Sequence, residues 1–405
     1  MKNVIRHSYL ETLSRFCDKN LIKVITGVRR VGKSTLMQQF QDLLMEKNPE
    51  ISLLSINLDI PEYRFLAEKS WKDLYDFITK ALHPNKMNYI FLDEIQNVTE
   101  FEKLLEGLFV QPNIDLYVTG SNAYLLSSEL ATLLTGRTYE INLLPFSFAE
   151  YLKLSGKQEN LNKAFVDYMR IGGFPEAIKL SVTNPVYTYQ YLQSVYNNIY
   201  RNDILKRFKI YSESSYQAVV NYLINTIGSS VSSGNIAKTL TANGAKTDNK
   251  SVSRYIEMLV DAFLFYKVNR YDIKGKQLLA TQEKYYSVDT GFRNALLGKE
   301  LTSNSGHLLE NIIYLELLRR RNQVWIGKAD LAEVDFVVRN EEGYLQYIQV
   351  SQTVQNPDTL ARELAPFDRI NDHNEKILIT MDYETGSRNG VKQVNAIDWL
   401  LKDSQ

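Results

Sequence analysis

The chain has 405 residues, and because domains typically hold ~100 to 200 residues, we expect two to four of them. Hydrophobic residues make up 44% of the chain and charged residues 23%, which excludes a disordered, collagen-like or coiled-coil protein. The 47 Lys and Arg balance the 47 Asp and Glu, so a basic surface over the whole molecule is excluded, although a local one is not.

The cysteine and histidine content limits the disulfides and metal sites that the chain can form. One cysteine, Cys17, and four histidines exclude an internal disulfide and a cysteine-based zinc cluster. The N-terminus lacks the apolar core of a signal peptide, and the apolar stretches are short and broken by charge. We therefore expect a cytoplasmic protein that is not bound to a membrane.

The first part of the chain predicts a parallel sheet. Residues 21–40 read LIKVITGVRRVGKSTLMQQF, a pattern typical of a strand, a loop and a helix. The runs SLLSINLD, NYIFLDE and IDLYVTGS follow, separated by helical stretches. Strands that alternate with helices indicate an α/β fold with a parallel sheet, which we assign to residues 1–143. Residues 144–209 have mostly helical spacing and form a predicted helical appendage.

The second half of the chain predicts two further domains. Residues 210–290 contain three helical patterns and then the strand-like runs FLFYKVNRYD and KQLLATQEKYYSV, an order that favours a winged helix. Residues 291–405 contain a helix, three strand-like runs, a second helix and another strand. We interpret them as a separate small α/β domain.

A phosphate-binding loop is predicted between the first strand and its helix. Residues 27–34 satisfy the pattern G-x-x-x-x-G-K-[ST] in this context. Glycines let backbone N–H groups surround phosphates, a lysine reaches the β and γ phosphates, and a serine hydroxyl binds Mg²⁺. A chance match on a glycine-rich turn is the alternative. The predicted nucleotide contacts are Gly27, Val28, Arg29, Arg30, Val31, Gly32, Lys33, Ser34 and Thr35, and Lys33 is also expected to be catalytic.

Two adjacent carboxylates end the strand Tyr89-Ile90-Phe91-Leu92. Ligands bind at the carboxyl ends of parallel strands, so Asp93 is expected to hold hydrated Mg²⁺ together with Ser34. Glu94 is expected to polarise the water that attacks the γ-phosphate. The alternative is a surface acidic pair that caps a helix starting at Ile95.

Small polar residues follow the strand Leu116-Tyr117-Val118. Thr119, Ser121 and Asn122 lie where a γ-phosphate sensor would be placed, and Asn122 is included among the predicted nucleotide contacts. Such residues after a strand also commonly form turns and helix caps, and that alternative stays open.

Taken with these motifs, the chain resembles the AAA-type P-loop ATPases of bacteria and archaea whose C-terminal half is a domain of unknown function. The resemblance rests on GVRRVGKSTL, FLDEIQNV, VTGSNAYLLSSE, LLTGRTYEINLLPFSFAEYL, IGGFPEAI, HLLEN and EVDFVV, and it covers nearly the whole chain. It implies an AAA domain that binds ATP and Mg²⁺, a helical lid over residues 144–209, a winged helix, and a C-terminal fold similar to PD-(D/E)xK nucleases.

Two further features follow from this resemblance. Arg137 matches the GR element of the family, and an arginine can neutralise charge that develops on the γ-phosphate. We expect Arg137 to be catalytic, in cis or across a subunit interface, whereas a solvated surface arginine is the alternative. The segment Gly172-Gly173-Phe174-Pro175 predicts a hinge of the lid.

The predicted winged helix has a local excess of positive charge. Residues 201–280 carry twelve Lys and Arg but six Asp and Glu. A helix starting at Lys250 would present Lys250 and Arg254 to the major groove of duplex DNA. A protein–protein module with solvated lysines is the alternative.

The nuclease-like part departs from the nuclease pattern. Asp335 fits the acidic position on one strand, and Glu310 fits the supporting helix. The next strand, however, has Gln349 and Ser351 where E-x-K is expected, so one metal-binding carboxylate and the lysine are missing. We therefore expect this domain, residues 291–405, to be catalytically inactive.

The sequence thus predicts a cytoplasmic Mg²⁺-dependent ATPase. Its ATP or ADP state is expected to reposition the winged-helix and nuclease-like half, in association with duplex DNA. One alternative is a slowly hydrolysing ATP-bound switch that acts through a protein partner, and another is an ATP-gated nuclease. The oligomeric state stays open.

Overall fold

The computed structural model describes residues 4–121, 136–298 and 305–402. The chain divides into two compact units, one with residues 2–144 and 261–263, and the other with residues 145–260 and 264–405. Within the described residues, no helix is long and apolar enough to cross a membrane.

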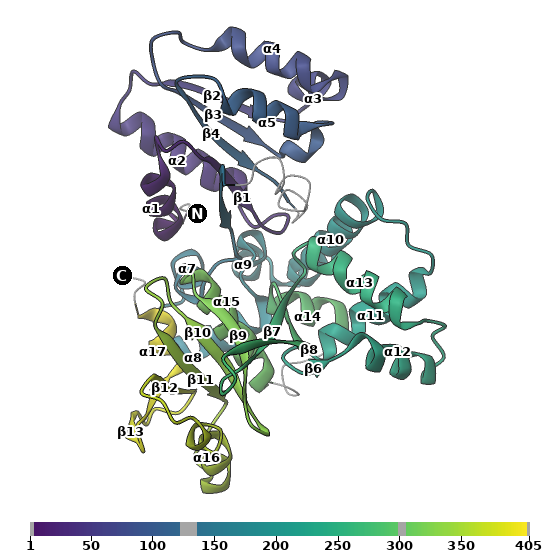
Figure 1. Ribbon diagram of the computed structural model, residues 1–405, viewed down its shortest axis with the longest axis vertical. Coiled ribbons are helices and arrows are strands. Elements are labelled where there is room, and N and C mark those ends of the chain that lie inside the picture. The colour runs from purple at the N-terminus through teal and green to yellow at the C-terminus, as the bar shows by residue number, and fades with distance from the viewer. Residues whose placement is uncertain (1–3, 122–135, 299–304, 403–405) are drawn as a thin grey trace. The chain divides into compact units, whose positions relative to one another are not determined.

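The first unit is built on a parallel five-stranded sheet (Figure 1). The strands lie in the order β2-β3-β4-β1-β5, and every neighbouring pair is parallel. This confirms the predicted α/β fold with a parallel sheet. The bounds are β1 Ile22–Thr26, β2 Ser52–Asn57, β3 Asn88–Asp93, β4 Ile114–Thr119 and β5 Thr138–Asn142.

Helices cover both faces of this sheet because successive strand residues point to opposite sides. Val24, Ile90 and Val118 belong to one buried apolar cluster with residues of α4 (Trp71–Ala81) and α5 (Phe101–Phe109). On the other face, the ring of Phe40 from α2 (Lys33–Lys47) lies 5.3 Å from that of Tyr117. The remaining helices of the unit are α1 (His7–Phe16) and α3 (Pro61–Lys69).

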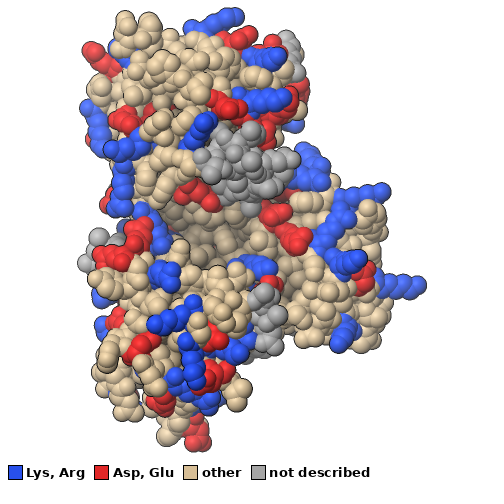
Figure 2. All heavy atoms as spheres, in the orientation of Figure 1, with Lys and Arg blue, Asp and Glu red and all other residues tan. Residues whose placement is uncertain are grey.

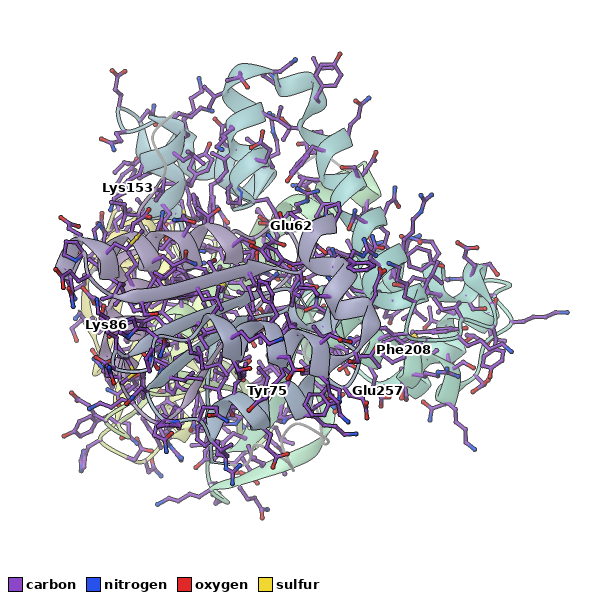
Figure 3. All side chains as sticks on the ribbon, turned by 90° about the horizontal axis from the view of Figure 1, so that it is seen from above. Glu62, Tyr75, Lys86, Lys153, Phe208 and Glu257 are labelled. Atoms are coloured by element: carbon purple, nitrogen blue, oxygen red, sulfur yellow. The ribbon has the colours of Figure 1, made fainter. Side chains whose placement is uncertain are left out.

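Side chains also connect elements at the edge of this unit. The amide of Gln111, after α5, donates a hydrogen bond of 2.7 Å to the hydroxyl of Tyr75 on α4, and Tyr75 is labelled in Figure 3. Gly107 of α5 packs against the same tyrosine ring, which a Cβ atom would approach to 3.0 Å. Close helix packing of this kind holds α4 and α5 together over the sheet.

Helices dominate the start of the second unit, as expected from the helical spacing of residues 144–209. They are α7 Phe148–Ser155, α8 Leu161–Ile171, α9 Pro175–Thr183 and α10 Thr188–Ile199, followed by a π-helical turn, η4, Tyr200–Leu205. A capping box between Ser147 and Glu150 starts α7.

Three helices and a hairpin follow, in the order expected for residues 210–290. The helices are α11 Glu213–Asn225, α12 Ser233–Ala242 and α13 Asn249–Asp261, and the hairpin strands are β7 Phe265–Asp272 and β8 Gln277–Ser287. A two-residue strand, β6 Ser230–Val231, between α11 and α12 pairs antiparallel with β8.

The remaining residues continue the same sheet rather than start a new one. It has nine strands in the order β13-β14-β12-β11-β10-β9-β7-β8-β6. The hairpin joins it through the parallel pair β7 and β9, so the sheet crosses the predicted boundary between residues 290 and 291. Its other elements are α14 Thr290–Leu297, α15 Ser305–Arg319, β9 Gln323–Ala329, β10 Ala332–Arg339, β11 Leu345–Ser351, α16 Pro357–Leu364, β12 Glu375–Thr380, β13 Gly386–Arg388, β14 Val391–Asn395 and α17 Ala396–Leu401.

The Gly172-Gly173 segment forms a tight buried crossing. Asp289 accepts a hydrogen bond of 2.6 Å from the Gly173 N–H, and the Gly173 carbonyl accepts one of 2.8 Å from the Phe146 N–H. A Cβ atom on Gly173 would lie 2.3 Å from the Phe146 carbonyl oxygen. Glycine is needed here for close backbone approach, and the hinge role of this segment stays a prediction.

Candidate nucleotide-binding site

The loop between β1 and α2 depends on its two glycines. Gly27 has a φ of +137°, and a Cβ atom there would lie 2.4 Å from the carbonyl oxygen of Leu143. Gly32, the N-cap of α2, has a φ of +102°. Side chains rarely adopt either conformation, so these positions require glycine.

Buried valines anchor the loop to the unit. Val28 and Val31 are fully buried, whereas Arg30, Ser34 and Thr35 are exposed. Arg29 is half-buried. The buried valines thus fix the inner side of the loop. The other side of the loop and the start of α2 are exposed, as a phosphate-binding loop requires.

Lys33 lies across the loop. Its buried ammonium donates hydrogen bonds to the carbonyl oxygens of Gly27 at 3.0 Å and of Val28 at 3.3 Å. The same nitrogen lies 4.0 Å from a carboxylate oxygen of Glu94. The structure therefore brings the predicted lysine and the predicted general base together.

Asp93 lies beside this loop because of the strand order. β4 lies between β1 and β3, so Thr119 at the carboxyl end of β4 lies next to Asp93. Thr119 donates a hydrogen bond to one oxygen of Asp93, and the amide of Asn57 donates one of 3.2 Å to the other.

The environment of Asp93 suits a cation. Burial raises the pKa of its carboxyl group above the ordinary value, and hydrogen bonds from Ser34 and Thr119 lower it in part. A buried carboxylate next to a serine hydroxyl offers the oxygen donors that Mg²⁺ prefers. The predicted pair of Ser34 and Asp93 therefore fits a magnesium ion.

Glu94 has a left-handed backbone, with a φ of +58°, and its N–H donates a hydrogen bond of 2.9 Å to Thr119. Its side chain does not cap the short helix Ile95–Asn97, so the capping alternative finds no support. Non-glycine residues in this conformation cost free energy and are frequent at functional sites.

Gln96 is a site residue that the sequence pattern did not indicate. Its amide donates hydrogen bonds to the carboxylate of Glu94 and, at 3.3 Å, to the hydroxyl of Ser121. Ser121 is fully buried. Thr119 and Ser121 thus both connect to the predicted acidic residues, Thr119 directly and Ser121 through Gln96, whereas Asn122 lies outside the described residues. Asn57 was also missed, although its place at the end of β2 is a usable sequence signal.

Arg137 lies at the other end of the sheet. It precedes β5, its carbonyl accepts a hydrogen bond of 2.7 Å from the Ile22 N–H, and Ile22 is the first residue of β1. The phosphate-binding loop follows the last residue of β1, roughly 16 Å away at ~3.3 Å per residue. The guanidinium instead lies over the Phe109 ring, 5.4 Å from its centroid. This position does not support a contact with phosphate bound to the same chain, and a role in trans stays a prediction.

The predicted nuclease-like positions form a second cluster, in the other unit. Asp335 of β10 accepts a hydrogen bond of 2.8 Å from the Val350 N–H. Gln349 of β11 accepts one of 3.3 Å from the Asp335 N–H and donates one of 2.9 Å to Glu363 of α16. Ser351 bonds only locally, to the carbonyl of Thr353 at 3.2 Å.

A buried lysine, which the sequence did not indicate, lies in this second cluster. Lys284 of β8 has 4% of its side chain exposed, and its nitrogen lies 3.0 Å from Glu310, 2.9 Å from Glu333 and 3.9 Å from Asp335. Burial alone would lower the pKa of Lys284, but the three carboxylates raise it above its ordinary value. The ammonium therefore stays charged.

Comparison with known proteins agrees with the fold of the first unit. Residues 19–152 match the family described as AAA domain (AAA_14), and residues 162–303 match a domain of unknown function, DUF8612. The five-stranded parallel sheet, with the phosphate-binding loop after β1, matches a P-loop ATPase domain.

Two relatives match most of the chain. An uncharacterized protein of Haemophilus influenzae is 36% identical over 98% of this chain and 99% of its own. The uncharacterized protein MJ1544 of Methanocaldococcus jannaschii is 28% identical over 90% and 83%. The Walker-type ATPase PABY2304 of Pyrococcus abyssi is similar in structure, with 14% identity, 73% and 95% coverage and a TM-score of 0.49, a level at which it carries no functional argument.

Proposed function

Because the chain belongs to the same family as the Haemophilus influenzae protein and contains an AAA domain, we propose that it binds ATP with Mg²⁺ and hydrolyses it. One observation carries this proposal. The glycine loop, Lys33, Asp93 and Glu94 meet at the carboxyl ends of β1 and β3, with Thr119 of β4 bonded to both acidic residues.

Each group has a distinct task in this proposal. The backbone N–H groups of residues 27–35 bind the phosphates, and Lys33 exchanges its carbonyl partners for phosphate oxygens. Ser34 and Asp93 would hold Mg²⁺, which neutralises phosphate charge when bound. Glu94 orients a water molecule and takes its proton. Thr119 and Ser121 respond to the γ-phosphate.

Two substitutions test the hydrolysis site. Lys33→Ala should abolish detectable ATP binding, because it removes the positive side chain aimed at the β and γ phosphates. Glu94→Gln should keep ATP affinity and lose turnover by roughly 10²-fold or more, the usual effect of losing a general base. Equilibrium binding of a fluorescent ATP analogue and steady-state phosphate release measure the two effects.

Glu100→Gln is the matched control. Glu100 also has a left-handed backbone, with a φ of +56°, but its exposed carboxylate pairs with Lys103. The control should leave both affinity and turnover unchanged. Unchanged ATP affinity in Lys33→Ala would refute the loop assignment, and weak ATP binding by Glu94→Gln would make Glu94 a structural residue.

For the second unit we propose a winged helix fused to a nuclease-like fold. The order α11-β6-α12-α13-β7-β8 and the pairing of β6 with β8 support the winged helix. The helix α15, the antiparallel strands β9 to β11, α16 and the parallel strand β12 support the nuclease-like part. The proposed domain bounds are 1–143, 144–209, 210–290 and 291–405, and one sheet continues across residues 290 and 291.

A second function, binding of duplex DNA, is favoured by one surface of this winged helix. Lys250 on α13 is exposed, and the guanidinium of Arg254 lies 5.3 Å from the ring centroid of Tyr211, which is itself 72% exposed. Lys209 lies over the same ring at 5.2 Å. Figure 2 shows several Lys and Arg side chains on the part of the surface where α12 and α13 lie. Cations beside an exposed aromatic ring suit a phosphate backbone, and fluorescence anisotropy with a labelled duplex tests this function.

A further inference from the structure

The cluster around Lys284 can be compared with the metal site of the nucleases whose fold we propose for this part of the chain. In PD-(D/E)xK nucleases, carboxylates hold a divalent cation and a lysine assists the attacking water. Here β11 contributes the neutral Gln349. The carboxyl groups around the Lys284 nitrogen are those of Glu310, Glu333 and Asp335. Lys284 belongs to β8, a strand that precedes the nuclease-like segment.

Donors of the protein already occupy the oxygens of Glu310. One oxygen accepts from the Lys284 ammonium at 3.0 Å and from the Tyr286 hydroxyl at 2.6 Å. The other lies 3.7 Å from Nδ1 of His307. Glu310 is 7% exposed and Tyr286 fully buried, so a metal ion would have to displace buried donors to reach this carboxylate.

Both oxygens of Glu333 and one oxygen of Asp335 also have protein donors. Glu333 lies 2.9 Å from Lys284 through one oxygen and 2.5 Å from Arg270 through the other. Asp335 lies 3.9 Å from Lys284 through one oxygen and accepts the Val350 N–H through the other. The Lys284 nitrogen lies within hydrogen-bond distance of Glu310 and Glu333, and 3.9 Å from Asp335.

We infer that the ammonium of Lys284 stands where related folds hold a divalent cation, so that this site is closed to metal and does not cleave nucleic acid. The inference rests on the proposed nuclease-like fold and is independent of the ATP site. It also gives the cluster a task. Lys284 of β8 bonds to Glu310 of α15 and Glu333 of β10, which fastens the hairpin of the winged helix to the nuclease-like part.

Removing the ammonium should therefore create a metal site. The parent is the full chain with Asp93→Asn. This substitution removes the carboxylate that is proposed to bind a metal ion at the ATP site. The parent should show no Asp335-dependent Mn²⁺ binding. Lys284→Met leaves the carboxylates uncompensated, so it should lower the melting temperature, bind Mn²⁺ at least about tenfold more tightly than the parent, and regain stability when Mn²⁺ is added. Paramagnetic resonance of free Mn²⁺ and thermal unfolding measure these effects.

Two further variants make the result specific. Adding Asp335→Asn to Lys284→Met should abolish the Mn²⁺ binding. Lys157→Met breaks a lysine pair with a single carboxylate, Asp167, at 2.6 Å, and should gain no Mn²⁺ binding.

Other results would overturn the inference. Mn²⁺ binding by the parent that Asp335→Asn removes would mean that Lys284 does not fill the site, and so would Mg²⁺-dependent cleavage of DNA by the natural chain. If the Lys284→Met chain is stable and does not bind Mn²⁺, Lys284 is only a counter-ion of the neighbouring carboxylates. If Lys284→Met does not fold, Gln349→Glu in the parent decides. With Lys284 in place it should gain no Mn²⁺ binding, and a gain would contradict the inference.

Discussion

Gln96 connects the two sides of the candidate ATP site. Its amide donates to the carboxylate of Glu94 and to the hydroxyl of Ser121, so the expected base and the expected phosphate sensor share one donor group. Its own amide oxygen is buried without a hydrogen-bond partner among the described residues. A donor to a carboxylate stabilises the charged form. We propose that Gln96 is a positioning residue that acts through Glu94.

Gln96→Leu tests this role. Loss of the amide donor should lower kcat by roughly tenfold, as a lost hydrogen bond to a charged group would, with little change in KM for ATP. Gln111→Leu, which removes the amide bonded to Tyr75, is the control. An unchanged kcat in Gln96→Leu, or an equal fall of kcat in Gln111→Leu, would contradict this role.

At the scale of elements, the junction between α8, α9 and α14 shows how a buried carboxylate can organise helix ends. Asp289 is the N-cap of α14 and accepts hydrogen bonds from the N–H groups of Gly173 and Gly291 at 2.6 Å and 2.8 Å. Gly172 also requires glycine, since a Cβ atom would lie 1.9 Å from an oxygen of Asp289. Burial raises the pKa of Asp289 to about 7, against the lowering effect of these N–H groups.

This pKa predicts a pH dependence of stability. The folded chain keeps the Asp289 proton up to about pH 7, whereas the unfolded chain loses it near the ordinary value of 3.8. The contribution to the free energy of unfolding is therefore complete below about pH 4, falls by roughly 1 kcal/mol per pH unit between about pH 4 and 7, and is constant above.

Asp289→Asn should remove this slope, because asparagine does not titrate, although the variant is less stable overall. Urea unfolding at several pH values measures the free energy of unfolding. Asp358→Asn, on the exposed face of α16, should leave the slope unchanged. An equal slope in Asp289→Asn and in the natural chain would show that Asp289 is ionised throughout.

At the scale of the whole molecule, we propose that the bound nucleotide changes the affinity of the winged helix for duplex DNA. An ATP-dependent change of DNA affinity requires, by linkage, that DNA change the affinity for ATP by the same factor. The winged-helix hairpin and the nuclease-like part share one sheet, so they should respond to nucleotide as one body.

Lys250→Glu combined with Arg254→Glu should weaken binding of a DNA duplex at least about tenfold and reduce its salt dependence, because two phosphate contacts are lost. Duplex DNA should stimulate ATP turnover by the natural chain and not by this variant. Lys163→Glu combined with Lys392→Glu changes the same charge at exposed positions of α8 and β14 and should have no effect. Turnover that ignores DNA but changes with a protein partner would favour the ATP-bound switch instead.

The sequence by itself determined the features that neighbouring residues encode. The glycines and Lys33 lie within eight consecutive residues between a strand and a helix, and the fold of such a segment follows from local conformational limits. Asp93 and Glu94 could be assigned because charged residues at the end of an apolar strand belong at the ligand-binding edge of a parallel sheet.

Only the tertiary structure decided which distant residues meet. Strand order placed Thr119 against Asp93 and put Arg137 at the far end of the sheet from the phosphate-binding loop. The pairing of β7 with β9 joined two predicted domains, and Lys284 lies in a cluster with Asp335, which is distant in sequence. Strand pairing depends on the free energy of burying whole sheet faces, so no local pattern around Lys284 or Arg137 contains it.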